Sequence, residues 1–199
     1  YLAQTTMNGA SLRGSNLTGA NLNGVNLRGG NLQGVRLTNA TLSRTNLIRA
    51  QLQKAEMDST DLAHSKLSFS NMSFANLNNA FLWNAHLIAA KLTSASLKRA
   101  SLRGAKLGLA TLENADLRYA DLTGANLNGA NLTGANLSGA MLRSADFTNF
   151  HMLIQIKTKL TNAIFRGADL TNTNLTRKLV KDAILCDTKT PWGLDNTNC

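Results

Sequence analysis

The sequence predicts an all-β fold, a four-sided parallel β-helix in which 20 residues make one coil, and two observations lead to this prediction. A large apolar residue recurs at every fifth position from Leu2 to Phe147, 30 times without a miss: 26 Leu, three Met and one Phe. A small residue stands two positions before each of them. It is Ala at 20 of the 28 such positions from Ala10 to Ala145.

A period of five fits neither common element, because a helix needs apolar residues about every 3.6 positions and a half-buried strand every 2. It fits a chain that turns by about a right angle every five residues, so that four sides close one coil. Coils stacked at about 4.8 Å would place each large residue above the one 20 positions earlier. The small residue would lie near the corner. The flanking polar residues would point outward, with Gly and Asn accepting the unusual corner dihedrals.

The phase of the repeat breaks near 148–159, TNFHMLIQIKTK, and the large residues resume at Leu160. The interval of 13 residues from Phe147 is interpreted as two repeats plus three extra residues. We therefore expect a loop or a short helix at 150–159. Its apolar residues would cover the coil.

The whole chain, 1–199, is expected to form a single solenoid domain. Its parts are regular coils at 5–149, the break, further repeats at 160–185 and a tail at 186–199. Lys178 falls on an inward position, so either the chain leaves the coil there or this side chain reaches solvent. The first coil carries no clear cap, and an uncovered strand edge favours end-to-end or edge-mediated self-association.

Residues 115 to 145, ADLRYADLTGANLNGANLTGANLSGAMLRSA, give the clearest run of the repeat. This run resembles the pentapeptide-repeat family, whose motif is A(D/N)LXX. The resemblance implies a right-handed quadrilateral β-helix. It says little about function, because members of the family do several unrelated things.

Two cysteines, Cys186 and Cys199, lie in the last 14 residues. A pair that closes a terminal loop is typical of a disulfide and of an oxidising compartment, and the alternative is two free thiols on a frayed end. The segment AILCDTKTPWGLDNTNC also resembles the C-terminal tail of exported pentapeptide-repeat proteins of cyanobacteria and chloroplast lumens. The resemblance implies the periplasm or the thylakoid lumen, with a cytoplasmic location as the alternative. We expect the tail to fold over the end of the column as a cap, with Trp192 as its apolar cover.

The sequence shows no catalytic constellation. Its three histidines, His64, His86 and His151, fall on different sides of the coil or in the break, and no phosphate-binding loop or metal-ligand spacing occurs. We therefore predict a protein that is not an enzyme and uses no cofactor or metal. No run of 18 apolar residues predicts a membrane span.

Residues 20 apart should be neighbours, which brings Lys66, His86 and Lys106 into one outward column. Like charges on adjacent rungs repel, so the column is a candidate anion-binding site. The alternative is that both lysines extend into water. The formal net charge of +10 is compatible with an anionic partner or simply with a soluble surface.

Exposed apolar residues give a second candidate surface, because such residues rimmed by charge often mark an interaction site. Phe81 and Trp83 should point outward on one side, with Arg103 one coil further on and placed for a cation–π contact with Trp83. Ile48 and Ile88 should share a column on the next side. The alternative is a set of scattered surface residues. A further group, Lys98, Arg99, Arg118 and Tyr119, is interpreted as a solvated face.

The leading functional prediction is a non-enzymatic structural or protein-interaction module whose rigid flat faces display side chains to a protein partner. The family resemblance supplies an alternative, a DNA mimic that binds gyrase and protects it from quinolones. Such mimicry needs an acidic stripe, and 11 acidic against 21 basic residues disfavour it. Direct nucleic-acid binding is suggested by charge alone and is also disfavoured, because no recognition motif accompanies the charge.

Overall fold

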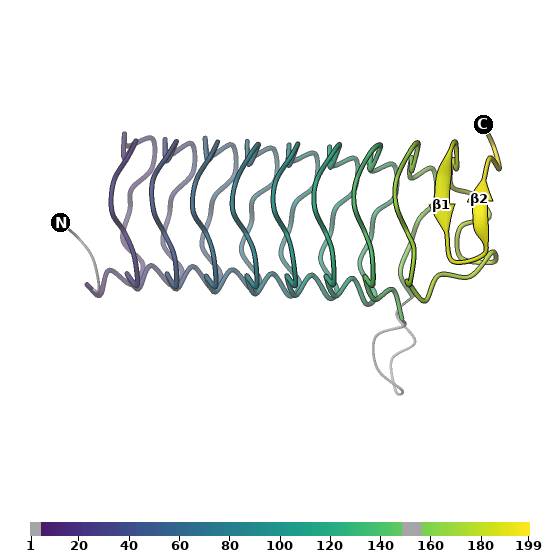
Figure 1. Ribbon diagram of the computed structural model, residues 1–199. Helices are drawn as coiled ribbons and strands as arrows, with labels where there is room; N and C mark the ends of the chain where they lie inside the picture. The colour runs from purple at the N-terminus through teal and green to yellow at the C-terminus, as the bar shows by residue number, and fades with distance from the viewer. Residues whose placement is uncertain (1–4, 149–156) are drawn as a thin grey trace.

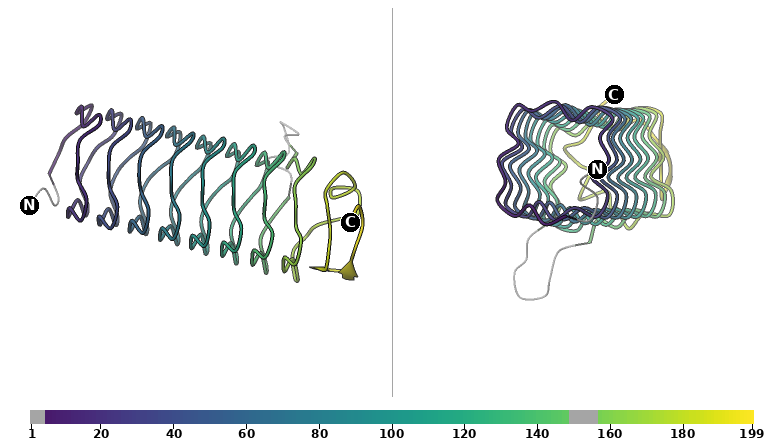
Figure 2. Two further views of the ribbon diagram at one scale, coloured as in Figure 1. Left: turned by 90° about the horizontal axis from the view of Figure 1, so that it is seen from above. Right: turned by 90° about the vertical axis from the view of Figure 1, so that its left-hand side faces the viewer.

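The computed structural model describes residues 5–148 and 157–199, which form a straight column of stacked coils with the termini at opposite ends (Figure 1). Viewed along the axis, each coil has a four-sided outline, and successive coils lie almost in register (Figure 2). No helix occurs among the described residues.

Parallel pairing holds the coils together. Single-residue bridges join residues 20 positions apart, from Thr6 with Asn26 to Asn126 with Asp146. Each inward residue donates to the next coil, as when Leu87 N–H donates to the carbonyl of Lys106 at 2.8 Å. The following coil donates back, from Lys106 N–H to the carbonyl of Ala85 at 2.9 Å. Residues 20 apart are therefore neighbours on the surface as well as in the core.

The core consists of the large and small residues of the repeat. From Leu22 to Leu142 the large residues are 0–1% exposed. Most hydroxyls that replace Ala are hydrogen-bonded, as Thr45 Oγ1 donates to the carbonyl of Leu22 at 2.7 Å, whereas the buried Ser65 Oγ has no hydrogen-bond partner among the described residues. In the first coil Met7, Leu12 and Leu17 are only partly buried, since in the described residues a coil covers them on one side only.

Each corner is a β-turn in which the small residue donates its N–H to the carbonyl of the large residue three positions earlier, as Ala20 does to Leu17 at 3.0 Å. The residue just before the small one has a φ near +60°, so Gly is favoured there; Gly124 has a φ of +66°. Asn before the large residue caps the turn: Asn16 Oδ1 accepts the N–H of Thr18 at 3.2 Å.

The break in phase contains eight extra residues. The pairing offset changes from 20 to 28 positions, because Asn131 pairs with Lys159 and Met141 with Asp169. The prediction of two repeats plus three residues is therefore wrong. Of the 13 residues from Phe147 to Leu160, the column uses the five of one side, and the other eight are an insertion. The predicted loop or short helix at 150–159 falls mostly on 149–156, outside the described residues. Just after it, Thr158 Oγ1 donates to the carbonyl of Leu127 at 3.1 Å.

The last coil keeps the period. Ile164 pairs with Ile184, 20 positions on, and Val180 is buried. Lys178 lies in a turn and is exposed, so it reaches solvent and its inward position is avoided. The chain ends in a hairpin of two strands, β1 (Thr188–Thr190) and β2 (Gly193–Asp195), paired antiparallel. β1 continues the column, because Lys189 bridges to Asp169.

Candidate interaction surfaces

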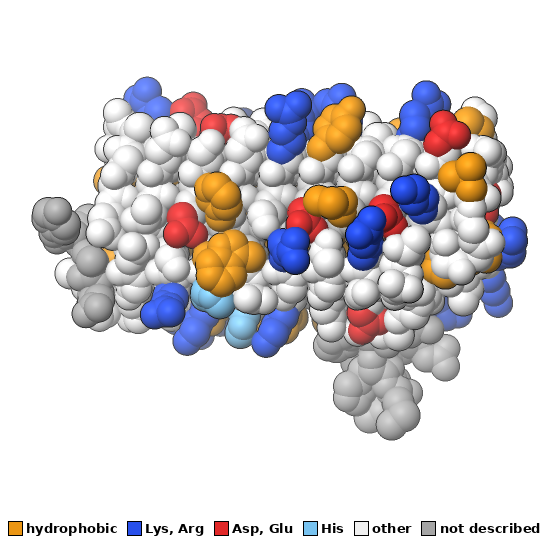
Figure 3. Space-filling model, viewed as in Figure 1, with side chains coloured by type: hydrophobic (Ala, Val, Ile, Leu, Met, Phe, Trp, Pro, Cys, Tyr) orange, Lys and Arg blue, Asp and Glu red, His pale blue; other side chains and the backbone are white. Residues whose placement is uncertain are grey.

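One side of the column, seen at the front of Figure 3, carries exposed apolar residues. We call it the aromatic face, and it consists of residues 21–25, 41–45, 61–65, 81–85, 101–105, 121–125 and 141–145. Phe81 is 49% exposed, Trp83 41% and Met141 45%. The predicted outward orientation of Phe81 and Trp83 is thus what the structure shows, whereas Met141 was not singled out from the sequence.

The partners of Trp83 differ from the prediction. Its ring meets that of His64 edge to face, with 4.3 Å between centroids. Arg103 lines a shallow hollow of about 410 Å³ beside Trp83, but its guanidinium turns the other way and pairs with Asp121 at 3.2 Å. The predicted cation–π contact between Arg103 and Trp83 is therefore wrong, because a carboxylate one rung further on attracts the cation more strongly than a ring does.

The next side, which we call the basic face, consists of residues 26–30, 46–50, 66–70, 86–90, 106–110 and 126–130. Bridges place Lys66 beside His86 and His86 beside Lys106, so the predicted column is assembled. Burial, together with the positive charges of Lys106 and Lys66 and a smaller effect of His64, lowers the pKa of His86. His86 is thus neutral at neutral pH, between two exposed lysines. Whether the column binds an anion stays a prediction.

Apolar side chains stand beside this column. Ile48 and Ile88 are half-buried and share one column of the basic face, so they lie on the side next to that of Phe81 and Trp83. Sequence reasoning missed Phe69, which is 57% exposed, and Leu109, both at corner positions of this face. A signal was present in the sequence, since a large apolar residue is uncommon at this position, which most often holds Gly.

The group of Lys98, Arg99, Arg118 and Tyr119 lines a hollow of about 280 Å³ on another side. Lys98 and Arg118 are both ion-paired with Asp116, at 3.4 and 2.8 Å. Burial raises the pKa of Asp116, but hydrogen bonds from Arg118 outweigh this effect and hold it below its ordinary value. Two of the three cations are therefore paired, but they share the single negative charge of Asp116, which offsets only one of them.

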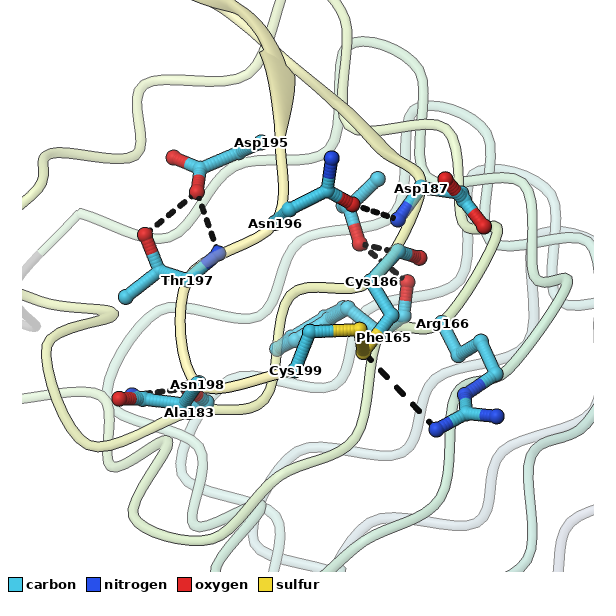
Figure 4. Close-up of a disulfide and its surroundings, with 11 residues drawn as sticks. Phe165, Arg166, Ala183, Cys186, Asp187, Asp195, Asn196, Thr197, Asn198 and Cys199 are labelled. Atoms are coloured by element: carbon cyan, nitrogen blue, oxygen red, sulfur yellow. Dashed lines mark hydrogen bonds between the residues drawn. A yellow bond between two sulfur atoms is a disulfide. The ribbon is translucent and has the colours of Figure 1, made fainter.

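A Cys186–Cys199 disulfide joins the end of the last repeat to the final residue of the tail, as predicted (Figure 4). Trp192 packs partly buried against the core, and its Nε1–H donates to Asp195 at 2.7 Å. Arg177 lies over the ring of Trp192 at 5.1 Å, which is the cation–π contact of the described residues. Hydrogen bonds from Thr197 and Trp192 lower the pKa of Asp195.

The described residues contain no group of three or more His, Cys, Asp and Glu side chains placed to hold a metal ion. In the same part of the chain, no helix is long and apolar enough to cross a bilayer. The side chains that the described part of the chain brings together are therefore surface residues, aligned in columns of residues 20 positions apart.

These features define a β-helical solenoid of stacked four-sided coils, a class in which function depends on what the sides display. A family model for pentapeptide repeats matches in eight copies, at residues 1–34, 31–68, 70–108, 110–149 and 156–177. The chain belongs to the pentapeptide-repeat family, and the right-handed quadrilateral β-helix follows from that membership. Proteins of this family are generally non-enzymatic and act in protein interactions.

Solved structures of the same family resemble the chain. HetL, a pentapeptide-repeat protein involved in heterocyst differentiation regulation in the cyanobacterium Nostoc sp. strain PCC 7120, is 29% identical, with a TM-score of 0.74 over 97% of this chain and 92% of HetL. Protein alr5209 of Nostoc PCC 7120 is 34% identical, with a TM-score of 0.39 over 54% of this chain and 78% of its own. Protein AT2G44920 of the Arabidopsis thaliana thylakoid lumen is 28% identical, with a TM-score of 0.20 over 64% and 72%. No curated protein matches the chain.

Proposed function

We propose that this protein is a non-enzymatic interaction module that binds a protein partner through the flat sides of its column. The observation that carries the proposal is the exposure of Phe81 and Trp83 on the aromatic face. Both stand where most repeats have a polar residue, and neither is needed by the core. Large apolar side chains held in fixed positions on a rigid surface are typical of protein-binding sites.

The alternatives have less support. Catalysis would need convergent nucleophilic, acidic or basic groups, and the described columns place like or unreactive side chains together. A DNA mimic that binds gyrase would need an acidic side. The aromatic face instead alternates charges, as in the pair of Arg103 with Asp121. An anionic partner of the Lys66, His86 and Lys106 column is compatible with the module and is developed below.

Two further observations fit this function. HetL is described as a protein involved in regulation, a role that a non-catalytic binding module can fill. The disulfide of Cys186 with Cys199 supports an exported location, the periplasm or a thylakoid lumen, because disulfides persist in oxidising compartments. We propose that location for this chain.

The test is capture of a partner from an extract of the source organism by the immobilised protein. A Phe81→Ser/Trp83→Ser variant should lose a protein that the wild type retains. A Phe74→Ser variant is the matched control, because Phe74 is 61% exposed on another side and should retain that protein. Equal capture by the two variants, or no protein retained by the wild type, would overturn the proposal.

A further inference from the structure

The charges of the basic face are segregated. Between residues 26 and 130 this face carries Arg28, Arg49, Lys66, His86 and Lys106, and it carries no Asp or Glu. None of the four cations Arg28, Arg49, Lys66 and Lys106 forms an ion pair within the described residues, whereas two cations of the neighbouring aromatic face do: Arg103 and Arg143 pair with Asp121 and Asp169. In Figure 3, Lys, Arg and His side chains gather along the lower edge of the view, below the aromatic residues. Between residues 26 and 130, the positive charge of this face is therefore not offset by any carboxylate on the same face.

The same face has an apolar strip. Ile48 and Ile88 lie in its middle column, and Phe69, Ala89 and Leu109 follow one another in its corner column. The column of Lys66, His86 and Lys106 borders this strip, whereas Arg28 and Arg49 lie within the middle and corner columns at its N-terminal end. The face is thus amphipathic across its width from residue 66 to residue 110.

The fold does not require these corner residues. Phe69, Ala89 and Leu109 have φ values of +61°, +54° and +60°. Gly29 and Gly129 occupy the same column without the cost that a side chain incurs there, about 1–2 kcal/mol for an L-residue in the left-handed region. Corners on the other sides carry side chains in the same conformation, such as Arg44 and Lys54, so what distinguishes this column is that three apolar residues follow one another in it.

The spacing of the strip matches a helix. Residues two rungs apart, such as Ile48 and Ile88 or Lys66 and Lys106, lie about 9.6 Å apart along the axis. Residues seven apart on an α-helix lie about 10.5 Å apart. A helix laid along the column could therefore place successive apolar residues over the isoleucines and carboxylates over the lysines, and it would meet no acidic side chain between residues 26 and 130 of this face.

We propose that the basic face binds an acidic amphipathic helix of a partner protein, oriented along the axis of the column. The proposal goes beyond the proposed function, because it assigns a second binding surface next to the aromatic face and the kind of partner that this surface fits. Apolar residues of the helix pack on Ile48, Ile88 and Phe69, and its acidic flank pairs with Lys66 and Lys106. A nucleic acid fits this face less well, because its described residues offer as stacking platforms only Phe69 and the partly buried ring of His86. A bilayer surface has no regularly spaced side chains, so the match between the column's spacing and that of a helix gives no reason to expect a membrane partner.

The probe is a synthetic helical peptide of about 18 residues, roughly 27 Å long, with leucines along one stripe and glutamates along its flank. Binding to the full chain is measured by fluorescence anisotropy. A Lys66→Glu/Lys106→Glu variant should bind at least about tenfold more weakly. The matched control is Lys91→Glu/Lys159→Glu, which changes the net charge equally on another side and should alter affinity less than about twofold. An Ile48→Ser/Ile88→Ser variant should also weaken binding about tenfold.

Several results would overturn the inference: no binding by the wild type, equal loss with the control pair, or no loss with either basic-face variant. Tighter binding of a single-stranded oligonucleotide, or of phosphatidylglycerol vesicles, through Lys66 and Lys106 would overturn it too. Circular dichroism melts confirm that each variant is folded. If the extract experiment succeeds through Phe81 and Trp83 while the peptide fails, the proposed function stands and this inference falls.

Discussion

The contact between Tyr119 and Gly139 gives a sharp test of how neighbouring coils pack. A Cβ built on Gly139 would lie 2.5 and 2.6 Å from two ring carbons of Tyr119. Gly139 also has a φ of +68°, so Ala there is strained whatever the space. The Gly139→Ala substitution should therefore both strain the backbone and displace the ring.

The two costs can be separated with a matched glycine. Gly124 has nearly the same φ, +66°, and no atom lies within 4 Å of its added Cβ. Gly124→Ala should lower the free energy of unfolding by about 1 kcal/mol, the backbone cost alone. Gly139→Ala should lower it by about 2 kcal/mol, because the lost ring packing adds about 1 kcal/mol to the same backbone cost.

The assay is urea unfolding followed by circular dichroism. A Tyr119→Ala/Gly139→Ala double variant completes a thermodynamic cycle, and removal of the ring should reduce the cost of the alanine to that of Gly124→Ala. Equal losses for the two glycine variants, or a coupling energy near zero in the cycle, would refute the claim that the ring rests on Gly139.

Three further predictions concern the core, the cap and the carboxylates. Leu87→Ala should lower the free energy of unfolding by about 3 kcal/mol, and Leu12→Ala by less than half of that, because Leu12 is only partly buried; similar losses in urea unfolding would contradict this. Cys199→Ser should cost about 3 kcal/mol, and a reductant should affect the wild type but not the variant, as thermal melts will show. Unfolding free energy should fall as the pH drops below about 4, because the folded pKa of Asp195 is lowered and the unfolded chain then binds more protons. Urea titrations should show a smaller fall for Asp195→Asn, and an equal fall would contradict the assignment.

The interior could be predicted from the sequence because it depends only on the period. Once the residues 20 positions away are placed, Leu87 can only point inward. The same offset of 20 positions places Lys66 beside His86. Neighbours in a column are a property of the backbone, so a one-dimensional count is enough to find them.

The rest depended on choices that the period does not make. Arg103 has a ring one rung before it and a carboxylate one rung after it, and only side-chain geometry decides between Trp83 and Asp121. The number of extra residues in the break depended on which side Lys159 joins, and spacing alone allowed two answers. The exposure of Phe69 follows from the left-handed corner that carries it outward.

The change of pairing offset between Asn131 and Lys159 has a consequence for engineering. The column takes in eight additional residues and resumes its register on the following sides, with Met141 opposite Asp169. That seam is therefore a natural place to splice in a guest sequence, such as an epitope or a fluorophore-labelling tag. Because the insertion follows Asp146, on the same side as Asn126, a reporter placed there would label the C-terminal end of the basic face and leave the sequence of the preceding coils unchanged.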